Sequence, residues 1–260
     1  MDPLKTRLSL ALDLVGDASF IILDFAEKGF AVETKVDGSF VTKADKETER
    51  ILRENILDHF PEDGLIGEEW GKQNDEAEWV WTIDPIDGTS SFINGVPLYG
   101  CMIGLLNNGK SVGGVVHFPS LNETVYAGLG MGTHHRRSNT SEFIPCKIKT
   151  AESLKKSMFS YSAPEYFSIS KNDELLELLR NTCSKERMWG DCYGHILVAT
   201  GRLDLMVDPY LHIWDLAPLK IIMEEAGGVH QGLDGNNSIS MTSGVSTSRT
   251  LMNELLSLLN

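Results

Sequence analysis

The chain has 260 residues, of which 42% are hydrophobic, and its formal net charge is -14 at pH 7. Such a chain can bury a substantial core, either as one large domain or as two closely packed halves. The acidic excess argues against nonspecific binding to nucleic acid or to an anionic membrane, because both depend on clustered Lys and Arg. We therefore expect small molecules and metal ions as partners.

The first part of the chain predicts two amphipathic helices with a hairpin-like segment between them. Apolar residues recur at helical spacing over residues 4–26 and again over 45–60. Residues 31–41 contain short extended runs around Asp37-Gly38, which is a strong turn signal, and carry Lys35. We expect a hairpin or a loop that crosses the sheet here.

The middle of the chain is typical of a meandering antiparallel sheet with a hairpin turn at Asn107-Asn108-Gly109. The expected strands cover residues 79–83, 99–106, 111–118 and 124–129. The polar stretch 132–142, which contains His134 and His135, predicts a solvated, mobile loop between two halves. After it, helix-like and strand-like segments alternate at 172–181, 193–200, 205–207 and 214–226, which indicates an α/β second half.

The cysteines and the N-terminus indicate a cellular compartment. Four cysteines include no CxxC pair and show no zinc-ligand spacing, which is typical of reduced thiols in a cytosolic protein. The N-terminus has no cationic region followed by an unbroken apolar run, and no stretch approaches the roughly 20 apolar residues that span a bilayer. We expect a soluble, cytoplasmic protein. The cysteines are Cys101, Cys146, Cys183 and Cys192.

The most informative segment is residues 81–94, WTIDPIDGTSSFIN, where an apolar strand runs into two aspartates. Pro85 fixes the turn between Asp84 and Asp87, so both carboxylates and the Ile86 carbonyl can face one pocket. Hard cations such as Mg²⁺ prefer oxygen ligands of this kind. A surface Asp-Pro turn is the alternative for two aspartates alone.

A phosphate-binding pattern follows directly. Gly88 allows the backbone to approach a ligand closely, and Thr89 opens a short hydroxyl-rich helix. The free N–H groups of a helix start favour an anion. We therefore expect a metal and a phosphate to meet here, with a Ser/Thr helix cap as the alternative.

Three further acidic motifs support this interpretation. Glu68 follows an apolar approach and a glycine, although adjacent glutamates are usually surface residues. Asp45 lies at a helix start, where it can orient a water or serve as an ordinary cap. Asp215 opens an apolar helix, either as an N-cap or as a further metal ligand.

The motifs GEE, DPIDGT and WDLAPLKIIMEEAGG, in this order, resemble the three signatures of the inositol monophosphatase family and cover nearly the whole chain. The resemblance implies an α/β fold, an αβαβα sandwich with an N-terminal half (1–145) carrying the metal and phosphate motifs. The C-terminal half (146–260) would carry Asp215 and the residues for substrate specificity. The resemblance also implies a homodimer and Mg²⁺-dependent hydrolysis of a phosphate monoester, with sensitivity to lithium.

Specific roles follow position by position from this resemblance. Gly88 and Thr89 would hold the phosphate by their backbone N–H groups. Asp45 and Thr89 would orient the attacking water and, with Glu68, form the catalytic group; Lys35 is either a basic residue near the outer metal or a surface lysine. The expected ligands of two or three Mg²⁺ ions are Glu68, Asp84, the Ile86 carbonyl, Asp87 and Asp215.

The organic part of the substrate would face residues 189–193 and 208–212, with Asp191, Cys192, Asp208 and Arg187 as candidate contacts. Two carboxylates suit a cationic head group such as an ammonium or an imidazolium better than a neutral polyol. Segments such as FPEDGLIGEEWG and GDCYGH are similar to the histidinol-phosphate phosphatase branch of the family. L-Histidinol phosphate, an intermediate of histidine biosynthesis, is therefore the expected substrate.

Two features depart from that branch, and other functions stay open. His134-His135 replaces a glycine-rich hairpin, and the segment around Asp208 differs from the usual Glu-bearing form.

Alternative functions are an inositol-1-monophosphatase or a broad sugar and nucleotide monophosphatase. A bisphosphate-specific enzyme would need more basic residues than Arg187 and Arg202, and a non-catalytic relative would lack a metal ligand. His195 and His212 are expected to be partly buried packing residues and not catalytic groups.

Overall fold

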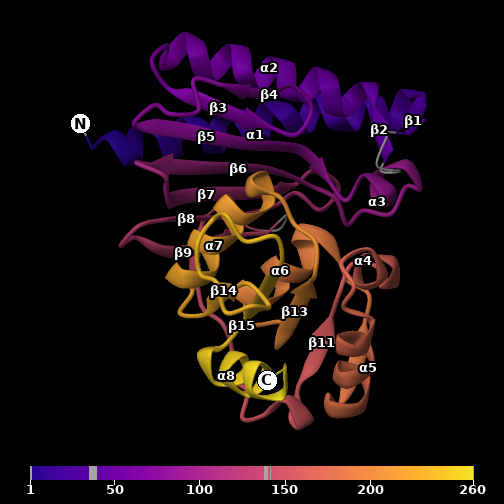
Figure 1. Cartoon of the computed structure of the whole chain (residues 1–260). Helices are drawn as coiled ribbons and strands as arrows, with labels where there is room; N and C mark the ends of the chain where they lie inside the picture. The colour runs from indigo at the N-terminus through magenta and orange to yellow at the C-terminus, as the bar shows by residue number, and fades with distance from the viewer. Residues whose placement is uncertain (1, 35–39, 138–139, 141, 260) are drawn as a thin grey trace.

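A computed structural model of the chain describes residues 2–34, 40–137, 140 and 142–259, and Figure 1 shows helices and sheets in alternating layers. The first layer contains the two helices that the sequence predicted, α1 (Pro3–Lys28) and α2 (Lys43–His59), which pack side by side. Within the described ranges, neither these helices nor any other is long and apolar enough to cross a membrane.

The second layer is an eight-stranded sheet with strand order β10-β9-β8-β7-β6-β5-β3-β4. The strands from β5 to β8 form the expected antiparallel meander, β9 and β10 continue it, and β3 pairs parallel to β5. The strands are β3 (Gly64–Gly67), β4 (Gly71–Gln73), β5 (Trp79–Asp87), β6 (Gly100–Asn107), β7 (Lys110–Phe118), β8 (Glu123–Gly128), β9 (Gly132–Arg136) and β10 (Ile144–Cys146). Two short helices, α3 (Thr89–Ile93) and η1 (Pro119–Leu121), connect neighbouring strands.

The prediction of a solvated loop from residue 132 is wrong for residues 132–136, which form β9. Side chains of β9 alternate between buried and half-buried positions, and the two buried residues, Thr133 and His135, each have a polar partner. The Thr133 hydroxyl donates to the Ile222 carbonyl at 2.7 Å, and His135 Nε2 lies 2.8 Å from Glu123 Oε1. Polar residues can occupy an inward-facing strand position when each is hydrogen-bonded, so polarity alone misidentified this strand.

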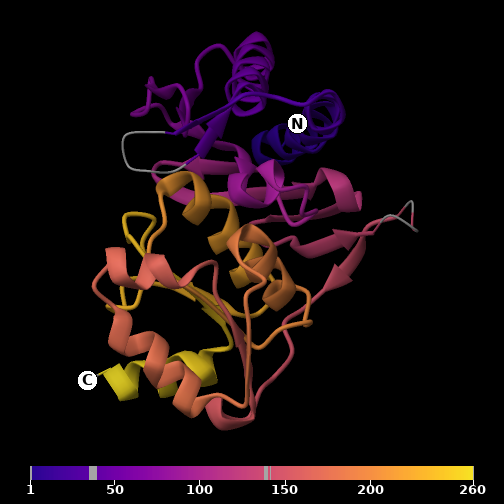
Figure 2. The same cartoon turned by 90° about the vertical axis from the view of Figure 1, so that its right-hand side faces the viewer.

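The third layer consists of α6 (Asp191–Ala199) and α7 (Ile213–Glu225), which lie between the two sheets (Figure 2). Two glycines of the large sheet permit a close approach of α7. A Cβ on Gly104 would lie 2.9 Å from Pro218 Cδ, and a Cβ on Gly114 would lie 2.6 Å from the Pro218 carbonyl oxygen. The start of α7 is thereby held against β5, where the sequence places the acidic motif.

The fourth layer is a five-stranded sheet with order β12-β11-β13-β15-β14, and the fifth contains three helices on its outer face. Apolar side chains from that sheet and from these helices form one buried cluster. The αβαβα prediction is therefore confirmed. The strands are β11 (Met158–Ser160), β12 (Lys185–Arg187), β13 (Leu205–Asp208), β14 (Val229–Gln231) and β15 (Gly244–Thr247), and the helices are α4 (Pro164–Ile169), α5 (Asp173–Thr182) and α8 (Arg249–Leu259), with the turn η2 (Leu154–Lys156).

A separate two-stranded hairpin lies between α1 and α2. Its strands are β1 (Val32–Thr34) and β2 (Phe40–Thr42), which pair antiparallel. The hairpin prediction is confirmed for these strands. The predicted turn at Asp37-Gly38 and the candidate Lys35 lie outside the described residues.

A buried ion pair joins α1 to the start of the large sheet. The Arg7 guanidinium donates two hydrogen bonds of 2.7 Å to Asp63, which also accepts the Trp81 indole N–H at 2.8 Å. The same guanidinium lies 4.2 Å from the Phe60 ring centroid. None of Arg7, Asp63 and Trp81 is a predicted metal ligand, although Trp81 belongs to β5 with Asp84 and Asp87, so the Arg7–Asp63 pair provides a control in the experiments below.

Candidate active site

An irregularity in β5 directs two aspartates to the same side of the sheet. Asp84 pairs with Met102 and Asp87 with Gly100, so two residues of β5 oppose one residue of β6. Side chains three residues apart point to opposite faces of a regular strand, and one extra residue returns them to the same face. Pro85 lies in this irregular stretch, where its missing N–H breaks no regular ladder bond.

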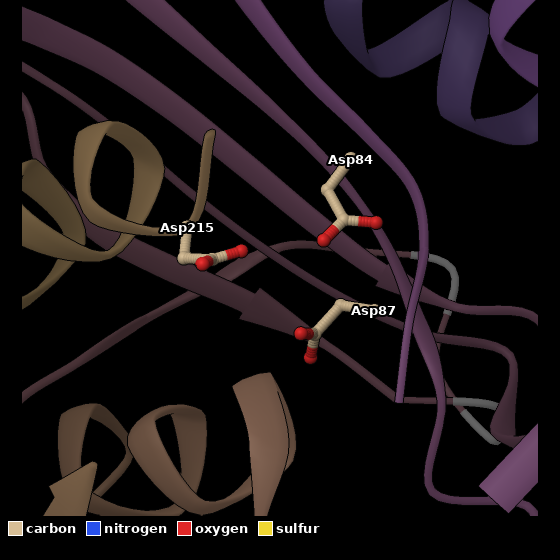
Figure 3. A group of neighbouring side chains, drawn as sticks. All are labelled: Asp84, Asp87 and Asp215. Carbon is tan, nitrogen blue, oxygen red and sulfur yellow. The ribbon is translucent and has the colours of Figure 1, made fainter. Parts of the chain in front are cut away.

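Asp215 completes a group of three carboxylates. In Figure 3 the side chains of Asp84, Asp87 and Asp215 point toward a common space between β5 and the start of α7. One oxygen from each carboxylate lies within 4.8 Å of the others. Asp215 is not the N-cap of α7, which is His212, but it accepts the His212 backbone N–H at 2.8 Å as part of a capping box. Its role as a metal ligand stays a prediction.

The electrostatics of this group fit a bound divalent cation. Burial raises the pKa of Asp84 well above its usual value, and the negative charges of Glu68, Asp87 and Asp215 raise it further. Burial likewise raises the pKa of Asp87 to about 6 and the pKa of Asp215 well above normal. A hard cation relieves this repulsion, and Mg²⁺ prefers carboxylate oxygens. The donor set therefore fits Mg²⁺.

Glu68 is brought to the same site by the parallel pairing of β3 with β5. Its backbone N–H donates to the Ile83 carbonyl at 3.2 Å, which extends the ladder by one residue beyond β3. Glu68 lines the same cavity as Asp84, Asp87 and Asp215. The four carboxylates predicted as metal ligands thus share one cavity.

The turn after β5 contains Gly88 and Thr89, the residues predicted to bind phosphate. Gly88 adopts a left-handed conformation with φ of 80°, and a Cβ there would lie 3.0 Å from Asp191 Oδ2. Both observations require glycine. The Thr89 hydroxyl donates to the Ile86 carbonyl at 3.2 Å, and Gly88, Thr89 and Ile86 all line the cavity.

Asp45 is held by its own helix start and is almost completely buried. Its carboxylate accepts the Thr42 backbone N–H at 2.7 Å and the Thr42 hydroxyl at 2.6 Å, which forms a capping box. Burial raises the pKa of Asp45 to about 6 despite these hydrogen bonds, and the charge of Glu68 contributes. Asp45 is not among the described residues that line the cavity, so its role with water stays a prediction.

The cavity has a volume of about 520 Å³ and extends from the carboxylate group across to α4 and α6. Asp191, Cys192 and Asp208 line it as predicted from sequence. Glu165 and Tyr166 of α4 also line it, and sequence reasoning missed both. No local motif marks them, because only the packing of α4 beside the second sheet brings them to the cavity.

The carboxylate of Asp208 and the backbone of Asp191 are linked through Ser162. The Ser162 hydroxyl donates to Asp208 at 2.6 Å and accepts the Asp191 backbone N–H at 2.8 Å. Asp208 Oδ2 also lies 3.1 Å from His195 Nε2, and His195 Nδ1 lies 2.7 Å from the Ser246 hydroxyl. Ser246 is fully buried and does not line the cavity, so this Ser-His-Asp arrangement supports Asp208 and does not resemble an accessible nucleophile.

Of the predicted substrate contacts Cys192 and Arg187, only Cys192 lines the cavity. The Cys192 backbone N–H donates to Asp87 at 2.6 Å, and burial, with the charge of Asp87, raises the pKa of its thiol. Arg187 does not line the cavity. It lies exposed on β12, where its guanidinium donates to the Glu186 carbonyl and lies 5.9 Å from the Trp189 ring centroid. The structure therefore gives no support for Arg187 as a substrate contact.

Comparisons with known proteins identify the family of this chain. A histidinol-phosphatase of Chlorobaculum parvum is 39% identical over 233 residues, covering 89% of this chain and 88% of that protein. A histidinol-phosphatase of Mycobacterium tuberculosis is 32% identical, with 97% of each chain covered. The solved inositol monophosphatase of Zymomonas mobilis superposes with a TM-score of 0.85 at 28% identity, covering 99% of this chain and 98% of that one. Residues 4–260 match the inositol monophosphatase family, and the chain belongs to that family.

Proposed function

We propose that this phosphatase hydrolyses L-histidinol phosphate to L-histidinol and inorganic phosphate. The observation that carries the proposal is the acidic lining of the cavity, where Asp191 lies against the turn after β5 and Glu165 and Tyr166 also line the space. A cavity that is acidic at both ends favours a substrate with a phosphate at one end and positive charge on the organic part.

The phosphate end is formed by the acidic group and the turn after β5. Glu68, Asp84, Asp87 and Asp215, with the Ile86 carbonyl, would hold Mg²⁺. The bound cations would neutralise the phosphate and make the attacking water more acidic. The backbone N–H groups of Gly88 and Thr89 would orient the phosphate, and the carboxylate of Asp45 and the hydroxyl of Thr89 would orient the water. Four carboxylate charges are balanced by two Mg²⁺ ions, and a third would accompany the phosphate.

The organic end matches the chemistry of histidinol phosphate. In that ester the ammonium group lies on the carbon next to the ester carbon, so a carboxylate beside the phosphate turn can reach it. Asp191 Oδ2 is 3.0 Å from the position of a Cβ on Gly88. The imidazole would extend toward Glu165 and Tyr166. Burial raises the pKa of the Tyr166 hydroxyl, and the nearby charges of Asp191, Asp208, Asp87 and Glu165 raise it further.

Asp208 contributes to this end mainly by its charge and position. The residue is 2% exposed, and both carboxylate oxygens already accept hydrogen bonds, from Ser162 and His195. Asp191 is therefore the better candidate for a direct contact with the substrate. Histidinol-phosphatases among the relatives support the same substrate class.

The decisive assay compares phosphate release from L-histidinol phosphate and from inositol 1-phosphate, with Mg²⁺ and with EDTA. We expect Mg²⁺-dependent release with a strong preference for histidinol phosphate. Equal or greater activity on inositol 1-phosphate would retain the metal mechanism and refute the substrate. Absence of metal-dependent release from either ester, and from a panel of sugar and nucleoside monophosphates, would refute both.

Asp191→Asn tests the recognition of the cation separately. The amide keeps the size of the side chain and removes its charge, so kcat/KM should fall at least tenfold for histidinol phosphate and much less for inositol 1-phosphate. Arg187→Gln is a matched control at a residue outside the cavity and should leave both values unchanged. Equal losses on the two esters in the Asp191 variant would remove the argument for a charged head group.

Further properties belong to the same proposal. All four cysteines are free, which suits a cytoplasmic enzyme, and Li⁺ is expected to inhibit by competing for the cation site. A homodimer is expected from the family, and analytical ultracentrifugation tests it. The division of the chain into halves at residues 145 and 146 stays a prediction. Strand β10 (Ile144–Cys146), which belongs to the first sheet, spans that boundary.

A further inference from the structure

A second acidic residue of α2 lies behind the proposed metal site and is not part of it. Glu49 follows Asp45 by one helical turn, and its side chain is completely buried. Its Oε2 accepts the Glu69 backbone N–H at 2.7 Å. Its Oε1 accepts the Trp70 backbone N–H at 3.2 Å and a bond of 2.9 Å from Arg53 Nη1.

These hydrogen bonds fix the backbone immediately after Glu68. The Arg53 guanidinium, besides pairing with Glu49, donates to the Gly71 carbonyl at 3.0 Å. On the other side, the Glu68 backbone N–H donates to β5 at Ile83. The turn between β3 and β4 is therefore held from two directions, by the sheet and by the carboxylate of Glu49.

Gly67 shows how closely the carboxylate approaches this turn. A Cβ at residue 67 would lie 1.9 Å from Glu49 Oε1 and 2.4 Å from Glu49 Cδ. Real Cβ contacts never approach this distance, so a side chain at residue 67 would displace the carboxylate or the strand. The glycine of the GEE motif thus makes room for Glu49.

We propose that Glu49 is a positioning residue that holds Glu68 in place to bind the metal. The inference rests on the proposed role of Glu68 as a metal ligand. Glu49 does not touch substrate or metal, and acts through the backbone of residues 69 and 70. Groups that orient metal ligands commonly change metal affinity by 10- to 100-fold when altered.

According to this proposal, two residues of α2 serve the same site. Asp45 and Glu49 are four residues apart and therefore lie on the same face of the helix. Asp45 is expected to orient the water, and Glu49 orients the turn that bears a ligand. A single rigid helix then sets the position of the water relative to the metal.

The experiment measures binding of Mn²⁺, a hard cation that suits the same oxygen ligands, by the loss of its free EPR signal. Glu49→Gln keeps the shape of the side chain, but its amide nitrogen cannot accept a backbone N–H. We expect the Mn²⁺ dissociation constant to rise about tenfold, and the Mg²⁺ concentration for half-maximal activity to rise in parallel.

Asp63→Asn is the matched control. Asp63 is also a buried carboxylate paired with an arginine and accepting an N–H donor, but its partners are Arg7 and Trp81. Both variants should lower the thermal midpoint in EDTA. Only Glu49→Gln should weaken Mn²⁺ binding, since a merely structural role would leave the affinity of the folded protein unchanged.

A double-mutant cycle separates positioning from a general effect of negative charge. If Glu49 acts through Glu68, then Glu49→Gln should have less than a twofold effect on Mn²⁺ affinity in a Glu68→Gln background. A full tenfold effect in that background, or unchanged affinity in the single variant, would overturn the proposal. Wild-type protein that binds no Mn²⁺ would instead refute the metal site itself.

Discussion

Asp84→Asn should stabilise the metal-free protein while it removes the response to Mg²⁺. The side chain is buried and lies in a group of carboxylates whose oxygens are within 4.8 Å of one another. Two unit charges at this separation repel by about 3 to 4 kcal/mol at an effective dielectric constant near 20. Asparagine keeps an oxygen that can accept the Ile86 backbone N–H, now bonded to Asp84 Oδ1 at 3.1 Å.

The expected increase in the free energy of unfolding is smaller than this Coulomb energy. The raised pKa values of Asp84, Asp87 and Asp215 mean that partial protonation already relieves part of the repulsion. We therefore expect about 2 kcal/mol at pH 8, where the carboxylates are most fully ionised. For a chain of this size that corresponds to about 4 °C in Tm.

Thermal unfolding in EDTA and in 10 mM Mg²⁺ at pH 8 provides the assay. Wild-type protein should gain Tm with Mg²⁺, because a ligand of the folded state stabilises it by about 2.7 kcal/mol at 100 times its Kd. The Asp84 variant should have a higher Tm than wild type in EDTA, and Mg²⁺ should raise its Tm only slightly. In Mg²⁺ the wild-type protein should therefore be the more stable of the two. Asp63→Asn, whose carboxylate is already paired with Arg7, should instead be destabilised in EDTA and gain normally. A variant of Asp84 that is less stable in EDTA and responds fully to Mg²⁺ would refute the reasoning.

Three further changes test other parts of the molecule. Thr89→Ala should lower kcat on histidinol phosphate at least tenfold with little change in KM, measured by steady-state kinetics, since the hydroxyl is expected to act on the attacking water; an effect confined to KM would contradict this. Burial and the nearby charge of Arg136 lower the pKa of His117 to about 4, so the unfolded chain binds one more proton and stability falls as pH drops from about 6.5 toward 4. His117→Asn should make that slope shallower by about 1 kcal/mol per pH unit in urea titrations, whereas an unchanged slope would show that His117 does not titrate as stated. Arg202→Met leaves the buried carboxylate of Glu123 with His135 as its partner and should lower the free energy of unfolding by about 2 kcal/mol, which the additional change Glu123→Gln should partly restore.

Much of the phosphate end could be predicted because its residues are contiguous. Asp84, Asp87, Gly88 and Thr89 lie in one short segment, so a strand end and a left-handed glycine suffice to bring them together. Asp215 is distant in sequence, and only its motif connected it with the others. Its approach depends on glycines of β6 and β7, whose role becomes visible only in the packing of α7.

The residues that sequence reasoning missed share a different property. Glu49 lies among charged residues on α2 and has the pattern of a solvent-facing side chain, yet it is completely buried against a backbone turn. Glu165 and Tyr166 lie on a helix of one and a half turns, too short for periodicity to indicate an exposed or a buried face. Each acquires its role from a distant segment, and no local pattern encodes such a contact.

The arrangement of the site separates the chemistry from the choice of substrate, but one contact couples them. The proposed metal ligands lie on the large sheet and α7, whereas the walls around the organic group come from α4, α6 and β13. Residues on the latter elements can change without moving the carboxylates. The exception is the start of α6, where the Cys192 N–H donates to Asp87 and the adjacent Asp191 lies against Gly88. A substrate cation at the proposed Asp191 contact would lie directly beside a proposed metal ligand, and changes at this residue should alter kcat as well as KM.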